Sequence, residues 1–352
     1  MPNCKQCGRP LFSYAAGDPQ EYCPDCLAKI REQEKQAIST SQLVRHIPVT
    51  TALIAINVLV FVIMVLNGVS PIQPTTDQII QWGAQYGPWT LNGDWWRLFT
   101  SMFLHNGPIH LALNMWCLWN LGLLAESLYG RWTFLAIYLA TGIGADLFSL
   151  SWDALRTSAG ASGAIFGLAG ALITGLYFAR LSVPRSQLAG MIRSVVIFAG
   201  LNLAIGLGIK VIDNMAHLGG LVTGLLIGLA MAPVLSRPRE QRQTGKLAVM
   251  TITVVVLLAA VFAVKKVQTY AVLFGRGDHL IDIQDYPGAV AQLEEAASKK
   301  PNSALVQQAL GYAYQMNHDE SHAIAAYRRA LQLNPDLRLA QTMLRKLQAA
   351  RP

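Results

Sequence analysis

A serine set between glycines is the first feature of the sequence that could do chemistry. The run Gly160-Ala161-Ser162-Gly163 opens an apolar segment that continues to Phe178. Backbone lies close around a serine flanked in this way, which suits a nucleophile whose tetrahedral intermediate needs nearby N–H donors. The same glycines would also let a neighbouring helix approach closely, so the alternative is a small-residue packing motif. A base and an oxyanion site close to Ser162 would decide between the two.

A histidine is the candidate base. His217 stands in the run Ala216–Gly220, near the start of another apolar stretch. Gly163 on the first segment and Gly220 on the second each belong to a face of small residues, and two such faces allow two helices to touch. That contact would bring the imidazole within hydrogen-bond reach of the Ser162 hydroxyl. The alternative is a structural histidine near a helix end.

The pair His110-x-x-x-Asn114 supplies candidate oxyanion donors. A spacing of four residues puts both side chains on one face of a helix. Their N–H groups, together with the backbone N–H of Ser162, could stabilise a developing oxyanion. The alternative is a hydrogen-bonding pair that only joins helices. Polar groups at the starts of three apolar segments favour nucleophilic catalysis.

The elements that must position these residues are membrane helices. Of the 352 residues, 53% are hydrophobic and only 14% are charged, against about 25% charged in a soluble domain. Seven apolar stretches approach the roughly 20 residues that a span needs. They are 48–66, 108–127, 131–152, 161–179, 190–208, 214–235 and 247–264. We therefore expect an all-α polytopic membrane protein, with a membrane domain over 48–235 and a seventh transmembrane helix over 247–264.

The charge distribution predicts the orientation. Lys and Arg in the flanks and short loops concentrate on the side of the N-terminus, which indicates a cytoplasmic N-terminus and, after seven spans, an outer C-terminus. The net charge of +8 then reflects this rule, and we expect no nucleic-acid partner. Ser162, His217 and His110 all fall near the outer ends of their spans. The loop 67–107 is outside and carries four tryptophans suited to the lipid interface. The polar first 45 residues predict no cleavable signal peptide.

Four cysteines at the N-terminus form a metal-binding pattern. Cys4-x-x-Cys7 and Cys23-x-x-Cys26 are separated by 15 residues, and two such pairs can close a tetrahedral site of four sulfurs. We expect a structural zinc ion in a ribbon-like domain over 1–30, followed by a linker over 31–47. Disulfides or a redox pair are the alternative, and a cytosolic location disfavours them.

The C-terminal segment has the spacing of tetratricopeptide repeats. Leu310, Gly311, Tyr314, Ala323, Tyr327, Ala330 and Pro335 match one repeat, and Ala289, Leu293, Ala296 and Pro301 match it one period of 34 residues earlier. We expect two helical pairs and a capping helix over 275–352, binding a protein or peptide partner. An unrelated pair of amphipathic helices is the alternative.

Four motifs together resemble the rhomboid intramembrane serine proteases. They are Trp96-Arg97, His110-x-x-x-Asn114, Gly160-x-Ser162-Gly163 and Ala216-His217-x-x-Gly220, in the order and spacing of that family. The resemblance covers residues 48–235 and implies a six-helix core in a bacterial plasma membrane. It implies a catalytic site in a water-filled cavity below the outer surface, and substrates that are single-span membrane proteins. No catalytic cofactor is implied.

The resemblance also implies residue roles. Ser162 and His217 would form a dyad without an aspartate, with His110, Asn114 and the Ser162 N–H as oxyanion site. Phe166 would pack on the catalytic histidine, where many members have tyrosine. The span 190–208 and the loop 209–214 would form the substrate gate. The residues implied to be structural are Gly163, Gly220, Arg97 and Glu126, and His105 matches a histidine near the active-site water.

Two further function classes compete with a protease. A catalytically silent rhomboid-like scaffold would capture membrane-protein clients with the same bundle and recruit partners through the C-terminal repeats. A transporter would need paired ionisable residues across the bilayer, and those available, chiefly Glu126 and Asp146, do not trace a path. Loss of proteolysis on substitution of Ser162 would separate the protease from the scaffold.

Overall fold

The computed structural model describes residues 3–4, 6–10, 22–29, 47–181, 183–208 and 212–349. The chain divides into two compact units, Met1–Pro48 and Val49–Pro352. In the first unit an isolated β-bridge joins Asn3 to Pro10, and residues 24–29 are helical. Most of the expected linker, residues 31–46, lies outside the described residues.

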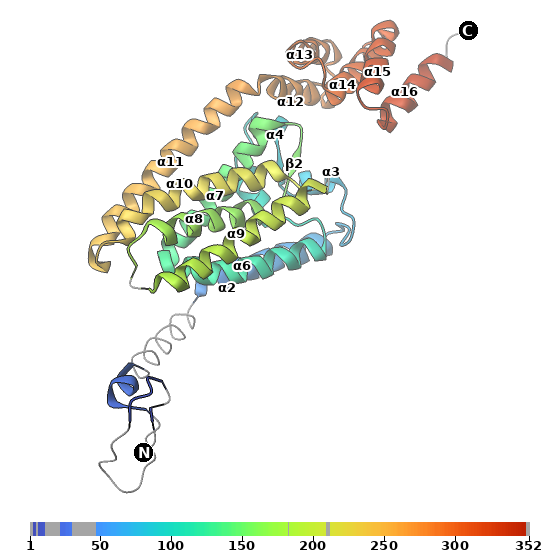
Figure 1. Ribbon diagram of the computed structural model, residues 1–352. Helices are drawn as coiled ribbons and strands as arrows, with labels where there is room; N and C mark the ends of the chain where they lie inside the picture. The colour runs from blue at the N-terminus through green and yellow to red at the C-terminus, as the bar shows by residue number, and fades with distance from the viewer. Residues whose placement is uncertain are drawn as a thin grey trace. The chain divides into compact units, whose positions relative to one another are not determined.

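Each of the seven apolar stretches forms a helix in the second unit (Figure 1). They are α2 (Pro48–Leu66), α6 (Pro108–Tyr129), α7 (Arg131–Trp152), α8 (Ser162–Phe178), α9 (Arg185–Gly208), α10 (Asn214–Leu235) and α11 (Arg242–Val267). In the described part of the chain, five of these are long and apolar enough to cross a membrane, namely α2, α7, α9, α10 and α11. The protein is therefore a multi-pass membrane protein.

The two remaining helices, α6 and α8, carry Ser162 and the candidate oxyanion residues. Helix α8 has only 17 residues, fewer than the roughly 20 of a typical span. Helix α6 is long enough, but His110, Asn114, Asn120 and Glu126 lower its hydropathy. Helix α8 is mostly buried in the bundle, where a short helix can be accommodated away from lipid, whereas α6 buries Asn114 and Glu126 on one face and exposes tryptophans on the other.

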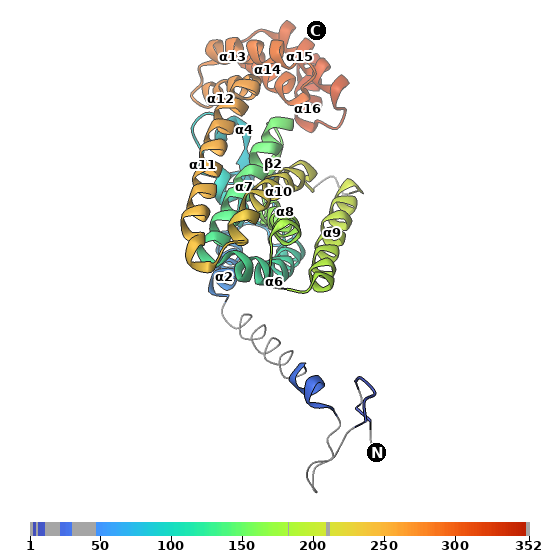
Figure 2. The same ribbon diagram turned by 60° about the vertical axis from the view of Figure 1, so that its left-hand side comes forward.

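Helix α8 is the central helix of the bundle. Twelve of its residues are buried, mostly glycine, alanine and leucine, and it packs most closely against α10. A Cβ atom at Gly220 would lie 2.0 Å from the carbonyl oxygen of Gly163, and one at Gly224 would lie 1.9 Å from that of Gly167. Only glycine permits this approach of two backbones. In Figure 2, α9 and α11 are the outermost helices on opposite sides, with α7, α8 and α10 between them.

Helix α6 ends in a polar contact that fixes α2. The buried carboxylate of Glu126 accepts hydrogen bonds from the backbone N–H groups of Val49 and Thr50, at 3.1 and 2.8 Å, and from the Thr50 hydroxyl at 2.7 Å. An anion at a helix N-terminus satisfies N–H groups that have no acceptor within the helix. Gly130, with φ of 81°, then turns the chain into α7.

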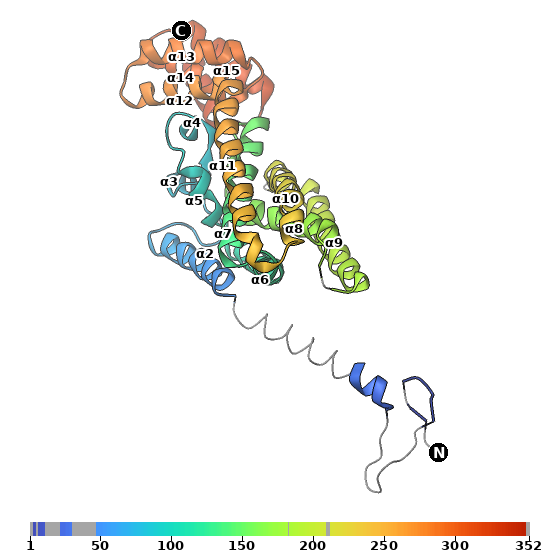
Figure 3. The same cartoon turned by 90° about the vertical axis from the view of Figure 1, so that its left-hand side faces the viewer.

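The loop between α2 and α6 is folded into short elements. They are α3 (Thr76–Gln81), β1 (Gln85–Tyr86), α4 (Gly87–Thr90), α5 (Arg97–Thr100) and the 3₁₀ helix η1 (Ser101–Phe103). Strand β1 pairs antiparallel with β2 (Thr157–Ser158), which directly precedes α8. Figure 3 shows α3, α4 and α5 together on one side of the bundle.

Arg97 organises this loop from a buried position. Its guanidinium donates to the carbonyl oxygens of Ile80 and Ala84, at 2.5 and 3.2 Å, and to the Asp94 carboxylate at 2.9 Å. It also lies over the rings of Trp89 and Trp96. A planar group with five donors can serve several acceptors at once, so this one side chain contacts five residues of the loop and holds them together.

The C-terminal segment is a row of helices. They are α12 (Thr269–Asp282), α13 (Tyr286–Lys299), α14 (Ala304–Met316), α15 (Glu320–Leu333) and α16 (Arg338–Ala349). Helix α12 begins six residues before the expected domain start at 275. Gly311 leaves room for the ring of Tyr327, and Gly277 leaves room for Leu293. The alanines of both expected repeat motifs are buried between paired helices.

Candidate active site

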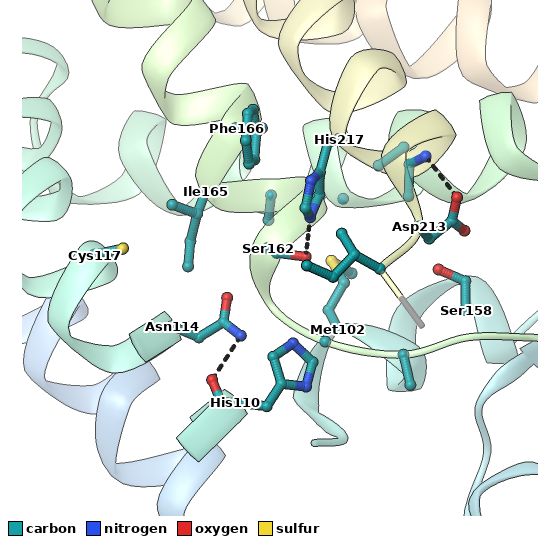
Figure 4. A pocket seen from close by; sticks show the side chains of 18 of the residues that line it. Met102, His110, Asn114, Cys117, Ser158, Ser162, Ile165, Phe166, Asp213 and His217 are labelled. Atoms are coloured by element: carbon teal, nitrogen blue, oxygen red, sulfur yellow. Dashed lines mark hydrogen bonds between the residues drawn. The ribbon is translucent and has the colours of Figure 1, made fainter. Parts of the chain in front are cut away.

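Ser162 and His217 meet at the end of the bundle where their helices begin. The Ser162 hydroxyl oxygen lies 2.8 Å from Nε2 of His217 (Figure 4). Ser162 is the first residue of α8, and His217 lies in the first turn of α10. Gly163 follows Ser162 by one residue, and Gly220 follows His217 by three residues. Because these glycines bring the two backbones together, the hydroxyl and the imidazole reach hydrogen-bond distance.

Among the described residues, no carboxylate accepts a hydrogen bond from Nδ1 of His217, the ring nitrogen that faces away from Ser162. The ring stacks on Phe166 with a centroid separation of 4.3 Å and an angle of 13° between planes. No residue of the described ranges forms a hydrogen bond with Nδ1 of His217. The ring is therefore oriented by aromatic stacking and by its contact with Ser162.

His110 and Asn114 lie across the cavity from this pair (Figure 4). The backbone N–H of Asn106 donates to Nδ1 of His110 at 3.3 Å, so Nδ1 is an acceptor and the ring proton is on Nε2. A Cβ atom at Gly160 would lie 3.1 Å from this Nε2. The imidazole thus presents its N–H beside the turn that leads into Ser162. Asn114 donates one N–H to the carbonyl oxygen of His110 at 2.9 Å and has a second one to offer.

The position of Ser162 at a helix start has an electrostatic consequence. The first N–H groups of a helix have no acceptor within it, and they carry the positive end of the helix dipole. Gly160, with φ of 132°, makes the turn before the helix, a conformation that favours glycine. Its N–H donates to the carbonyl oxygen of Ser101 at 2.9 Å, which holds the turn in place.

A cavity of about 380 Å³ contains all of these groups. Its wall includes Phe198 and Asn202 of α9, Cys117 of α6 and Met102 of η1. The cavity therefore extends from the Ser162–His217 pair to the inner face of α9. Of the loop 209–214 that follows α9, residues 209–211 lie outside the described residues.

Asp213 is a site residue that the motif reasoning missed. It caps α10, accepting hydrogen bonds from the N–H groups of Met215 and Ala216 at 3.2 and 3.1 Å. The Ser149 hydroxyl donates to its other oxygen at 2.5 Å. An acidic residue just before an apolar run is a capping signal that the sequence offered. Because His217 follows one turn later, this cap fixes the start of the helix that carries the imidazole.

His105 is buried beside this site. Its ring centroid lies 5.1 Å from that of His110, and neither ring nitrogen has a hydrogen-bond partner among the described residues. It forms no hydrogen bond with the Ser162–His217 pair within the described ranges.

The four N-terminal cysteines form a cluster that fits a metal ion. The sulfurs of Cys4, Cys7, Cys23 and Cys26 all lie within 4.8 Å of one another. Four sulfurs about 2.3 Å from a tetrahedral zinc ion would be roughly 3.8 Å apart, and Cys7 and Cys23 are 3.6 Å apart. The backbone N–H of Cys23 lowers the pKa of the Cys4 thiol to about 6, which favours the ligating thiolate. All five cysteines lie in the described ranges, and none forms a disulfide.

Comparison with known proteins identifies the family. The Rhomboid domain matches residues 92–234. Rhomboid protease AarA of Providencia stuartii is 30% identical over 263 residues, which are 68% of this chain and 88% of that protein. The chain belongs to the rhomboid family. Rhomboid protease GluP of Bacillus subtilis is 34% identical over 203 residues, 57% of this chain, but the match spans only 38% of that protein. RHOMBOID-like protein 6, mitochondrial, of Arabidopsis thaliana is 39% identical over 136 residues, 39% of this chain and 43% of that protein.

Family membership gives the enzyme class. Both bacterial relatives are named rhomboid proteases, and their similarity to this chain supports serine endopeptidase activity. All four motifs that carried the resemblance lie within the matched residues 92–234. The matched range begins in the loop between α2 and α6 and ends within α10, so α2, α11 and the helices after α11 lie outside it.

Proposed function

We propose that this chain hydrolyses peptide bonds in transmembrane segments with a Ser162–His217 dyad. The observation that carries the proposal is the 2.8 Å hydrogen bond between the hydroxyl and Nε2, formed inside a cavity at the end of a membrane bundle. The proposed substrates are single-span membrane proteins, as the family implies.

The proposed chemistry uses groups already in position. Ser162 attacks the scissile carbonyl as its proton moves to Nε2 of His217, and the imidazolium then gives that proton to the leaving amine. In the second half, His217 takes a proton from water as the water oxygen attacks the acyl carbonyl, and it returns the proton to the Ser162 oxygen as the ester bond breaks. Stacking on Phe166 holds the ring while it shuttles the proton.

The proposed oxyanion site consists of the Nε2–H of His110, the second N–H of Asn114 and the N–H of Ser162. These donors come from two helices that are fixed by packing, so they need little reorganisation when charge develops on the carbonyl oxygen. Removal of one such donor typically lowers kcat by about 10²–10³-fold.

Access to the cavity is proposed to occur beside α9. This helix is mostly exposed on the outer side of the bundle, and Phe198 and Asn202 form part of the cavity wall. A transmembrane segment could enter between α9 and α6 from the lipid, while water enters from the end at which α8 and α10 begin.

The added parts have proposed roles of their own. The four cysteines are proposed to hold a structural zinc ion in the domain 1–30. This zinc would take no part in catalysis, because a site with four protein ligands has no open position. The helices α12–α16 are proposed to form a tetratricopeptide array with a protein or peptide partner. The proposed location is a bacterial plasma membrane, with the N-terminus cytoplasmic and the array outside.

Labelling with a fluorophosphonate tests the proposal against the silent scaffold. A serine activated by a base reacts with this probe, whereas a scaffold serine does not. We expect purified wild type to be labelled, and Ser162→Ala and His217→Ala to be unlabelled. Asn120→Ala is the control. Asn120, like Asn114, donates to the carbonyl oxygen four residues earlier in α6, that of Trp116, but it lies on an exposed face away from the cavity. Wild type that stays unlabelled would leave the scaffold as the better reading.

A further inference from the structure

The first helix of the C-terminal array packs on the membrane domain rather than hanging from α11. The side-chain amide of Asn92, after α4, donates to the carbonyl oxygen of Val272 on α12 at 2.9 Å. The amide of Gln268, just before α12, donates to the carbonyl oxygen of Ser151 on α7 at 2.6 Å. These two bonds attach α12 to the outer loop and to the end of α7.

The packing between α12 and α4 is close enough to require a glycine. A Cβ atom at Gly275 would lie 2.4 Å from the carbonyl oxygen of Pro88 and 2.7 Å from the amide nitrogen of Asn92. Apolar side chains of α12, including Tyr270 and Phe274, share one buried cluster with Leu91 of the loop and Ala154. The face of α12 is therefore covered by the chain's own loop (Figures 1 and 3).

The loop element α4 is fixed in turn to the segment that precedes the nucleophile. The N–H of Gly87, at the start of α4, donates to the carbonyl oxygen of Ala154 at 3.0 Å, and a Cβ atom at Gly87 would lie 2.2 Å from that oxygen. Next to it, Tyr86 pairs with Thr157 in the β1–β2 ladder. Residues 157–160 then line the catalytic cavity and lead into Ser162.

We infer that α12 is a support for this cavity edge, and that Asn92 and Gly275 are positioning residues for the reaction at Ser162. The inference rests on the proposed function. Packing and hydrogen bonds connect α12 to α4, and α4 to residues 154–158. These residues lead to Gly160, which lies against His110. Without α12, the loop would lose its covering helix, and residues 157–160 would hold the oxyanion donors less tightly. The array thus acts on catalysis from outside the active site.

The test measures the rate constant of fluorophosphonate labelling separately from the final labelled fraction. Gly275→Ala introduces a clash with backbone, and Asn92→Ala removes the bond to Val272. Arg276→Ala is the control on the same helix, because Arg276 is exposed, and Asn120→Ala is the control for asparagine. We expect Gly275→Ala to lower the rate constant about 10-fold and Asn92→Ala to lower it less, since a misplacement of about 1 Å can cost roughly 10²-fold and the change acts here through an intervening loop.

Hydrogen exchange gives the second readout. We expect deuterium uptake at 87–92 and at 154–160 to rise in Gly275→Ala and Asn92→Ala, and to stay at the wild-type level in both controls. The labelled fraction should remain that of wild type, because the Ser162–His217 contact depends on α8 and α10. Asn92→Ala keeps the test decisive if Gly275→Ala does not fold.

Three results would overturn the inference. The first is a wild-type labelling rate in a variant whose uptake at 87–92 shows that α12 has detached. The second is a reduced labelled fraction with an unchanged rate constant, which is loss of folded protein alone. The third applies if wild type itself is unlabelled, in which case the proposed function fails and hydrogen exchange alone tests the support role of α12. Equal deuterium uptake at 154–160 in wild type and Gly275→Ala would then overturn the inference.

Discussion

The substitution Gly220→Ala probes how the close approach of α8 and α10 serves catalysis. The added Cβ would lie 2.0 Å from the carbonyl oxygen of Gly163, whereas ordinary contact begins near 3.4 Å, so the backbones must part by about 1.4 Å. Ser162 and His217 lie one and three residues from this contact, and their 2.8 Å hydrogen bond would be broken. Misplacement by about 1 Å can cost roughly 10²-fold in rate, and we expect a loss of that size in both cleavage and fluorophosphonate labelling.

Helix propensity cannot produce this result. Alanine stabilises a helix interior relative to glycine by about 0.5–1 kcal/mol, so any loss must come from the clash. Gly190→Ala is the matched control, because Gly190 is a helical glycine and, among the described residues, nothing outside its own helix lies within 4 Å of its Cβ position. Circular dichroism should show both variants folded. Cleavage by Gly220→Ala within about twofold of wild type would refute the claim that this contact sets the dyad geometry.

Three further predictions concern other parts of the chain. Glu126→Gln should lower the stability of the detergent-solubilised protein by about 1–3 kcal/mol, because the start of α2 loses its anionic acceptor; an unchanged denaturant midpoint would contradict this. Asp213→Ala should slow labelling and lower the unfolding midpoint. Asp213→Asn should unfold close to the wild-type midpoint, since asparagine caps helices as well as aspartate does; equal midpoints for Asp213→Ala and Asp213→Asn would exclude a capping role. Metal analysis should find one zinc per chain in wild type and none in Cys4→Ser or after strong chelation, with labelling of Ser162 unaffected; loss of labelling with zinc would assign the ribbon a role in catalysis.

Local patterns were sufficient to predict the helices. All seven apolar stretches are helical, since long apolar runs in lipid have few other ways to satisfy their backbone. Helices α9 and α11 begin at Arg185 and Arg242, five residues before the apolar stretches, because polar residues at a helix end can continue its hydrogen bonding. Helix α8 was predicted as the apolar stretch 161–179 and runs from Ser162 to Phe178.

The candidate site was predicted from spacing, but its fine geometry was not. The proton position on His110 depends on the N–H of Asn106, and the cap of α10 depends on Asp213, which belongs to none of the family motifs. The contact of Asn92 with Val272 joins residues 180 positions apart. A pattern within one segment carries no information on which distant surface will cover it, so this contact could not be predicted from the sequence.

Cleavage of a single-span membrane substrate by the purified protein tests the central claim most directly. Mass spectrometry of the fragments would give both the rate and the cut position. The dyad predicts that wild type and Asn120→Ala cut the substrate within or beside its transmembrane segment, and that Ser162→Ala and His217→Ala release no fragment although they fold. Undiminished cleavage by Ser162→Ala would contradict the assignment of Ser162 as the nucleophile.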